Sequence, residues 1–127
     1  MKNLRINDRI INRYLFYRNL YINRIYSSSL KKIKKIDHYQ WWFQKQKFRK
    51  SFLILKENKP IFISTTDHFN FKKYKFIYSG LLSCLPETNL FDFLKAIKIQ
   101  NVYLNKQKKR YCLISINKKN TVLLHHW

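Results

Sequence analysis

The chain has 127 residues and a mass of 15.8 kDa, with 27 Lys and Arg against 6 Asp and Glu, which gives a formal net charge of +21. A hydrophobic fraction of 46% is too high for a disordered chain, and the length leaves room for one domain spanning residues 1–127. The chain has only two Cys, which argues against a disulfide framework, and its N-terminus has no apolar segment of the kind found in signal peptides. Its apolar runs are far shorter than the ~20 residues of a membrane span, so the sequence predicts a soluble cytoplasmic protein.

The predicted elements begin with a short strand over residues 3–6. Asp8 is expected to cap a helix after it, because the apolar residues that follow recur at helical spacing. The segment 27–36 is predicted to be a loop or a broken helix. A second helix of roughly 37–46, capped by Asp37, carries a Trp-Trp-Phe stretch.

Three strands are predicted next. Residues 48–56 and 61–66 are rich in β-branched and aromatic side chains, and a tight turn at 57–60 joins them. A third strand of the same kind covers 72–84 and contains the only glycine of the chain, Gly80. These segments predict strands that run antiparallel to one another.

The remainder is predicted to hold a helix, a strand and a final helix. The first helix covers 90–99, with Thr88 or Asn89 as its cap. Residues 111–117 are apolar enough for a strand in mid-sheet, and 121–127 begin the last helix. The order β-α-α-β-β-β-α-β-α predicts an α/β (α+β) fold with a mixed, mostly antiparallel sheet flanked by helices.

Four short motifs follow one another in an order known from a large superfamily. The first helix ends in Arg-Asn (Arg18 and Asn19) with Arg24 downstream, and the second carries an acidic residue followed by His-x-x-Trp at 37–42. A charged Asn-Lys-Pro turn follows at 56–61, and a strand runs into an Asn-led segment at 114–120. This series resembles the GNAT acyl-CoA N-acetyltransferases, most closely the branch that acetylates amino groups on nucleotide-activated sugars.

The resemblance implies a GNAT-like fold, acetyl-CoA as co-substrate and an amine acceptor, with a nucleotide-activated amino sugar as the acceptor class. Substrate contacts are implied for the end of the first helix and for the second helix, namely Arg18, Asn19, His38, Trp41 and Trp42. One member of the Trp pair is expected to line the acceptor cleft beside Arg18 and the other to pack inward. Cofactor contacts are implied for the fourth strand and the helix starts after it, namely Leu81, Leu82, Ser83, Thr88, Asn89 and Asn117.

Transfer of an acetyl group to an amine needs a base for the amine proton and donors for the oxyanion. Backbone N–H groups near 81–83 are the implied donors. His38, Asp67 and His68 are candidate bases, and two interpretations of His68 stay open: a catalytic group facing the cleft or an exposed turn residue. His125 occupies roughly the place of the family's general acid, so the predicted catalytic residues are His68 and His125.

The loop after the fourth strand departs from the family pattern. GNAT enzymes carry glycines and a cation there, which bind the CoA pyrophosphate at a helix N-terminus. Here residues 81–90 have no glycine after Gly80 and no cation, and Glu87 would repel phosphate. Affinity for acetyl-CoA is therefore expected to be reduced, leaving a weak enzyme and an inactive one as alternatives. The family's closing strands are also absent, which predicts either a domain truncated at its C-terminal end or a reduced paralogue.

A basic, non-catalytic nucleic-acid-binding protein is the alternative function. Basic and aromatic residues alternate at 45–50 and 71–76, where rings could stack on bases while Lys neutralises phosphate. A half-buried strand produces the same alternation. Inward Tyr74 and Phe76 would favour the acyltransferase, and outward ones stacking. The four His and two Cys lack metal-ligand spacing, so no metal site is predicted.

Overall fold

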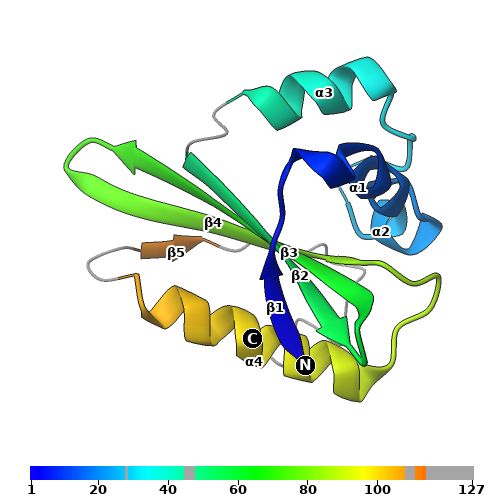
Figure 1. Ribbon diagram of the computed structural model, residues 1–127. Helices are drawn as coiled ribbons and strands as arrows, with labels where there is room; N and C mark the ends of the chain where they lie inside the picture. Colours follow the sequence, from blue (N-terminus) through cyan, green and yellow to red (C-terminus); the bar gives the residue numbers. More distant parts are fainter. Residues whose placement is uncertain (28, 45–47, 108–110, 114–127) are drawn as a thin grey trace.

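The computed structural model describes residues 1–27, 29–44, 48–107 and 111–113. A five-stranded sheet in the order β1-β2-β3-β4-β5 lies between two layers of helices (Figure 1). Its strands are β1 (Lys2–Arg5), β2 (Arg49–Lys56), β3 (Lys59–Phe71), β4 (Tyr74–Ser83) and β5 (Tyr111–Leu113). The first four pair antiparallel, and β5 pairs parallel with β4. The predicted fold class, a mixed and mostly antiparallel sheet flanked by helices, is confirmed.

Three helices cover one face of the sheet and one covers the other (Figure 1). The first face carries α1 (Ile11–Arg18), α2 (Tyr21–Ile25) and α3 (Lys35–Phe43), and the second carries α4 (Leu90–Asn105). The predicted last helix and the end of the predicted strand 111–117 lie outside the described residues, as do Asn117 and His125. Within the described ranges, every helix is too short or too polar to cross a bilayer.

Each face of the sheet has its own part of the core. Side chains alternate along β3, so Ile63 packs with Tyr14 and Trp42 under α1 and α3, while Phe62 packs with Ala96 of α4. From residue 63 onwards, odd-numbered residues of β3 therefore face α1–α3; Ile61, beside the irregularity in the pairing with β2, belongs to the α4 side of the core. Antiparallel pairing of β3 residue 63 with β4 residue 82 places the even-numbered residues of β4 on that same face.

The predicted helix starts are right for α4 and wrong for α1. The side chain of Asn89 accepts hydrogen bonds from two N–H groups in the first turn of α4, so Asn89 is the cap. Asp8 was expected to cap the first helix, but Asn7 caps a 3₁₀ turn over Asp8–Ile10 and α1 starts after it. Asp8 instead accepts a hydrogen bond from Trp42 Nε1 at 2.7 Å, a contact between distant segments.

The end of α1 and the start of α3 also depend on tertiary contacts. The side chain of Asn19 binds both the N–H and the carbonyl of Ile33, at 2.7 and 3.0 Å, and this clamp holds the connection that separates α1 from α2. The next helix begins at Lys35, before the predicted cap Asp37, which lies in its first turn.

The strand β3 is longer than predicted and pairs with β4 from Phe62 to its end at Phe71. Asp67 and His68, for which a turn was one expectation, are strand residues opposite Tyr78 and Ile77. Aspartate is rare in strands, but here Arg49 of β2 holds the Asp67 carboxylate in an ion pair. This cross-strand contact explains why the sequence pattern ended the strand too early.

Candidate active site

A cavity of about 360 Å³ lies between α2, β4 and the beginning of α4. Asn23, Phe62 and Phe93 form part of its wall. Four of the predicted cofactor residues also line it, namely Leu81, Leu82, Ser83 and Thr88. The cavity walls are mainly apolar, and no Lys, Arg, Asp or Glu of the described residues lines it.

One edge of β4 faces away from β3 towards this cavity. The N–H of Cys84 donates to the carbonyl of Ile61 on β3 at 2.9 Å. Because backbone groups of an antiparallel strand alternate in direction, the N–H and carbonyl of Leu81 point to the opposite edge. In the described part of β5 only residues 111–113 pair with that edge, opposite Phe76 to Tyr78. Leu81 therefore presents backbone groups where an extended ligand could add to the sheet.

The end of β4 is fastened to α2 by Asn23. Its side-chain amide donates to the carbonyls of Tyr17 and Ser83, at 2.7 and 2.8 Å, and its oxygen accepts from the N–H of Ser83 at 2.9 Å. The N–H of Ser83 is thus already occupied, whereas that of Leu82 points towards β3. Of the three predicted backbone donors, Leu81 is the one whose N–H points away from β3 without a hydrogen bond to Asn23.

The N-terminus of α4 is largely occupied by its own cap. The side-chain oxygen of Asn89 accepts from the N–H groups of Phe91 and Asp92, at 2.8 and 3.3 Å. Asp92 adds a negative charge to the first turn and forms an ion pair with Lys56 of β2. This helix start therefore provides fewer free N–H groups for a phosphate than expected, and its dipole is already complemented by a carboxylate.

On the α1–α3 face, Gly80 opens a gap in the middle of β4. It lies opposite Thr65, whose hydroxyl bonds to the hydroxyl of the buried Tyr14. A Cβ atom built on Gly80 would meet no atom of the described residues within 4 Å. Its carbonyl accepts from the buried Gln100 side chain, which fixes the strand from the α4 side. The strand is thus held firmly while the space above Gly80 stays open.

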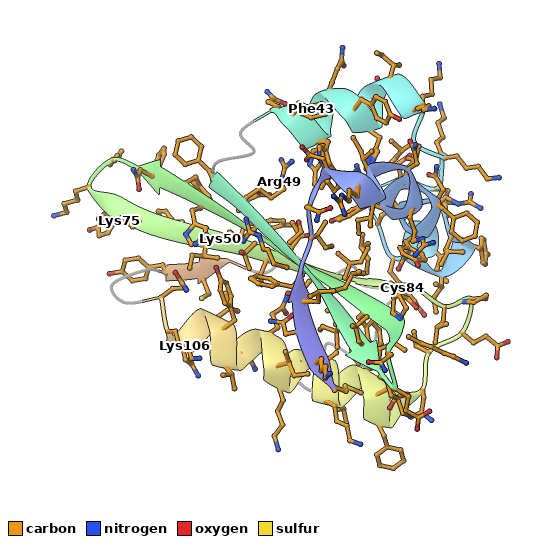
Figure 2. The ribbon with its side chains drawn as sticks, in the orientation of Figure 1. Phe43, Arg49, Lys50, Lys75, Cys84 and Lys106 are labelled. Carbon is orange, nitrogen blue, oxygen red and sulfur yellow. The ribbon has the colours of Figure 1, made fainter. Side chains whose placement is uncertain are left out.

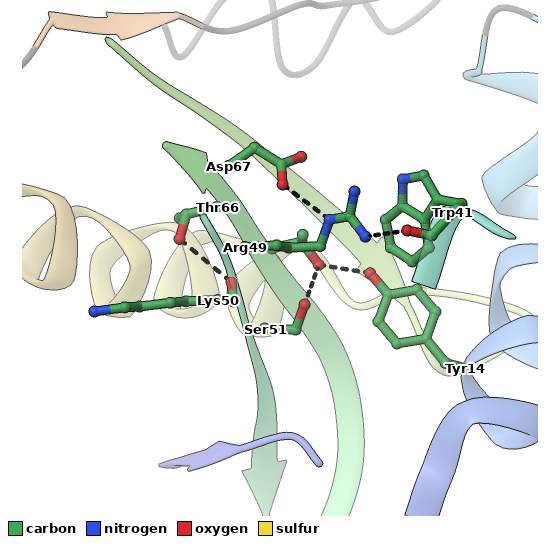
Figure 3. Close-up of polar contacts among 8 residues, drawn as sticks. Tyr14, Trp41, Arg49, Lys50, Ser51, Thr66 and Asp67 are labelled. Atoms are coloured by element: carbon green, nitrogen blue, oxygen red, sulfur yellow. Dashed lines mark hydrogen bonds and ion pairs between the residues drawn. The ribbon is translucent and has the colours of Figure 1, made fainter. Parts of the chain in front are cut away.

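An Arg–Trp–Asp cluster lies on the same face of the sheet (Figure 3), where Asp67 follows Thr65, the partner of Gly80, by two residues along β3. Arg49, which extends from β2 towards α3 (Figure 2), donates from Nε to Asp67 at 2.8 Å and from Nη1 to the carbonyl of Trp41 at 2.6 Å. Its guanidinium carbon lies 3.8 Å from the centre of the Trp41 ring. Arg18 approaches the same ring to 4.4 Å. Two cations thus share one aromatic side chain.

His38 is buried behind this cluster. Arg18 Nη1 lies 3.1 Å from His38 Nδ1, and His38 Nε2 lies 2.8 Å from the carbonyl of Ile11. Because a guanidinium can only donate, Nδ1 accepts and the proton is on Nε2, so the ring is neutral. Burial lowers the pKa of His38, with Arg18 also disfavouring its charged form. Trp42 is buried and Trp41 lies beside Arg18, as expected for the pair.

The free energy of unfolding is expected to fall as the pH drops below about 6.5. The pKa of His38 is lowered from 6.5 in the folded chain, so the unfolded chain binds the proton at a higher pH. Stability that depends on neutral His38 is complete above pH 6.5 and is lost as the pH falls towards the folded pKa. Urea unfolding of wild type and His38→Gln at several pH values across this range checks the prediction. An equal change of the free energy of unfolding with pH in the two proteins would contradict it.

No family model matches the sequence, and no curated protein does. Solved structures do match. An N-acetyltransferase from Staphylococcus aureus has a TM-score of 0.75 at 15% identity, over 98% of this chain and 79% of that one. A predicted acetyltransferase from Clostridium acetobutylicum, solved with acetyl-CoA, has a TM-score of 0.72 at 11% identity, over 98% of this chain and 87% of that one. The GNAT domain of S. lividans PAT has a TM-score of 0.72 at 8% identity, over 97% of this chain and 76% of that one. The chain has the GNAT fold.

Within this GNAT fold, the predicted site residues form two groups. Four of the six assigned to the cofactor line the cavity, whereas Asn89 caps α4 and Asn117 lies outside the described residues. Arg18, His38 and Trp41 meet on the α1–α3 face. Asn19, predicted to bind substrate, uses its side chain on the backbone of Ile33. The predicted catalytic His68 belongs to neither group: it lies on the α4 face of β3, opposite Ile77, and is not among the residues that line the cavity.

Two features of the site were not predicted. Arg49 becomes important only when strand pairing places it opposite Asp67. The open space above Gly80 had one signal, a glycine inside a strand pattern.

Tyr74 and Phe76, whose position was expected to distinguish an acyltransferase from a nucleic-acid-binding protein, do not agree. Phe76 is half-buried and stacks on Phe69, whereas Tyr74 is 42% exposed. Among the described residues, no group of three or more His, Cys, Asp or Glu could hold a metal ion.

Proposed function

We propose that the chain transfers an acetyl group from acetyl-CoA to an amine. The observation that carries this proposal is the cavity at the edge of β4 that faces away from β3, in a GNAT fold. Solved N-acetyltransferases share the fold, and one of them is described with acetyl-CoA. The chemistry of an acyl-pantetheine arm suits the cavity, because the arm is narrow and largely apolar and its amides can pair with a strand edge.

The proposed reaction places the thioester beside Leu81 and the amine above Gly80. The amine nitrogen attacks the thioester carbonyl, a C–N bond forms, the C–S bond breaks and the sulfur leaves with the electron pair. The N–H of Leu81 is positioned to stabilise the negative charge that develops on the carbonyl oxygen. The proton released by the amine goes to the leaving sulfur or to solvent through the open space above Gly80.

The acceptor proposed from the motif resemblance is an amino group on a nucleotide-activated sugar. The residues that support this class are those of the Arg-Asn and His-x-x-Trp motifs, which come together at Arg18, His38 and Trp41. Weak catalysis is part of the proposal, because Asn89 already occupies the N–H groups at the start of α4.

The direct test incubates the purified protein with acetyl-CoA and a panel of amines. Release of the CoA thiol is followed with a thiol reagent, and the acetylated product is identified by mass spectrometry. Acceptor-dependent thiol release with formation of the N-acetyl product is expected. Thiol release that is the same with and without every amine would contradict the proposal.

Replacing Glu87 by Arg is expected to lower the KM for acetyl-CoA. Glu87 precedes α4 and lies next to Thr88 of the cavity wall, where it would repel the pyrophosphate of CoA. Exchanging an exposed repulsive charge for an attractive one contributes about 1 kcal/mol, or roughly fivefold in KM, and less at high salt. Steady-state kinetics with acetyl-CoA measure this change.

Acetyl-pantetheine is the matched control for this variant, since it carries the same thioester without phosphate. Its KM is expected to be the same for wild type and Glu87→Arg. A parallel change with both donors would mean that the substitution alters the cavity rather than the charge near the pyrophosphate.

A further inference from the structure

Excess positive charge surrounds the Trp41 ring. The guanidinium carbons of Arg18 and Arg49 lie 4.4 and 3.8 Å from its centre. Arg49 has one carboxylate partner, Asp67, while Arg18 has a neutral one, the imidazole of His38. Two positive charges therefore share one negative charge at this position.

The neighbouring side chains do not remove this excess. A cavity of about 50 Å³ opens beside Arg49 and Trp41, and its charged walls include Arg5 and Asp8. Together with Arg18 and Asp67, the cluster contains three cations and two carboxylates. In a volume that holds several water molecules, a small anionic group could complete the balance.

Burial makes the unbalanced charge costly. The side chain of Arg49 is only 11% exposed. The pKa of Arg18 is lowered chiefly by burial, and the charge of Arg49 adds to this effect. Cations removed from water without a counter-charge are unfavourable, so such an arrangement is typical of a site that takes an anion.

Both guanidiniums keep hydrogen-bonding capacity. Arg49 uses Nε and Nη1 for Asp67 and the Trp41 carbonyl, and Arg18 uses Nη1 for His38, which leaves Nη2 of each without a protein hydrogen bond among the described residues. A planar guanidinium matches the oxygens of a phosphate or carboxylate in pairs. A purely structural role explains the bonds of Arg49 but not why a second cation is placed beside it.

We propose that Arg18 and Arg49 bind an anionic group of the amine acceptor, a phosphate or a carboxylate, against the Trp41 ring. This inference rests on the proposed acetyl transfer and deepens it by assigning the acceptor class: an amine that also carries an anionic group. The bound anion would lie on the α1–α3 face, beside the open space above Gly80 where the amine is acetylated.

Three acceptors with the same amino sugar test this inference: glucosamine, glucosamine 6-phosphate and muramic acid, which adds a carboxylate. With acetyl-CoA, kcat/KM is expected to be at least about tenfold higher for an anionic acceptor than for glucosamine, because hydrogen bonds between charged groups are the strong ones. The phosphate and carboxylate arms show which anion the site prefers. In Arg18→Gln and Arg49→Gln the advantage is expected to disappear.

Arg13→Gln is the matched control, because Arg13 is an exposed residue of the same helix as Arg18. It lowers the net charge equally, so it should keep the preference for anionic acceptors. Arg18→Gln removes no hydrogen bond to the backbone, and circular dichroism on each variant separates a lost site from a lost fold. Equal rates with all three acceptors, or an equal loss in Arg13→Gln, would overturn the inference while leaving the acetyl transfer intact.

Binding gives a readout that does not need catalysis. Titration with glucosamine 6-phosphate is expected to quench Trp fluorescence in wild type and Arg13→Gln, and to have little effect in Arg18→Gln. If no amine is acetylated but this difference is found, the proposed function fails and the anion site stands. If neither glucosamine 6-phosphate nor muramic acid binds or reacts, the anion site is overturned.

Discussion

Replacing Gly80 by Val is expected to abolish acetyl transfer while leaving the protein folded. The backbone φ of Gly80 is not positive, and a Cβ there meets nothing within 4 Å, so the fold accepts a side chain. A branched residue in a strand interior reduces the freedom of the unfolded chain, which raises the free energy of unfolding by about 0.4–1 kcal/mol. The same side chain fills the space in which the amine must approach the thioester.

The loss of activity should be large because the reaction depends on close approach. A displacement of about 1 Å between reacting groups costs roughly 100-fold in rate. Steady-state transfer assays and urea unfolding measure the two effects side by side. Gly80→Ala is the graded control, since it adds one carbon: it should give most of the gain in stability and a smaller loss of activity. A fully active and more stable Gly80→Val would show that the space above β4 is not used.

The order of elements was predictable because it rests on local patterns. The hairpin between β2 and β3 is an example: Glu57 and Asn58 have positive φ values of 53° and 63°, as expected for a tight turn between two β-branched strands. The Asn89 cap is another, because the side chain binds N–H groups two and three residues away. Features that depend on residues only a few positions apart can be recognised in the sequence itself.

The errors arose where distant segments meet. The separation of α1 from α2 depends on Asn19 binding Ile33, and the length of β3 depends on Arg49 compensating Asp67. Neither contact has a local signature. The hydrogen bond from Trp42 to its partner near α1 likewise spans 34 positions in the sequence.

The candidate site divides in the same way. Arg18, His38 and Trp41 were identified because the helical motifs that carry them are contiguous, and the structure places them together. Arg49 was missed because its position at Trp41 follows from the pairing register of β2 and β3. His68 was expected to follow a strand that ended at residue 66, but β3 continues through it to Phe71. Side chains of a strand alternate between its two faces, so the face on which His68 lies could not be assigned once the strand end was predicted too early.

Replacing Leu81 by Pro is expected to lower the kcat of acetyl transfer by roughly 100- to 1,000-fold, the range seen when one oxyanion donor is removed. Proline removes the N–H that points away from β3, whereas the N–H groups that pair with β3 belong to the neighbouring residues. The extended backbone that proline requires before it is compatible with Gly80, whose φ is not positive. The prediction is checked by single-turnover kinetics with acetyl-CoA.

Two variants isolate the role of this N–H. Leu81→Ala also loses the packing of the side chain against the α4 cluster but keeps the N–H, so it should retain most of the activity that Leu81→Pro loses. Leu82→Pro removes an N–H directed at β3 and is expected to destabilise the sheet, because a buried carbonyl then lacks its donor. Similar kinetics for Leu81→Ala and Leu81→Pro would mean that the backbone of β4 does not stabilise the reacting carbonyl. The oxyanion donors would then have to lie elsewhere along the cavity.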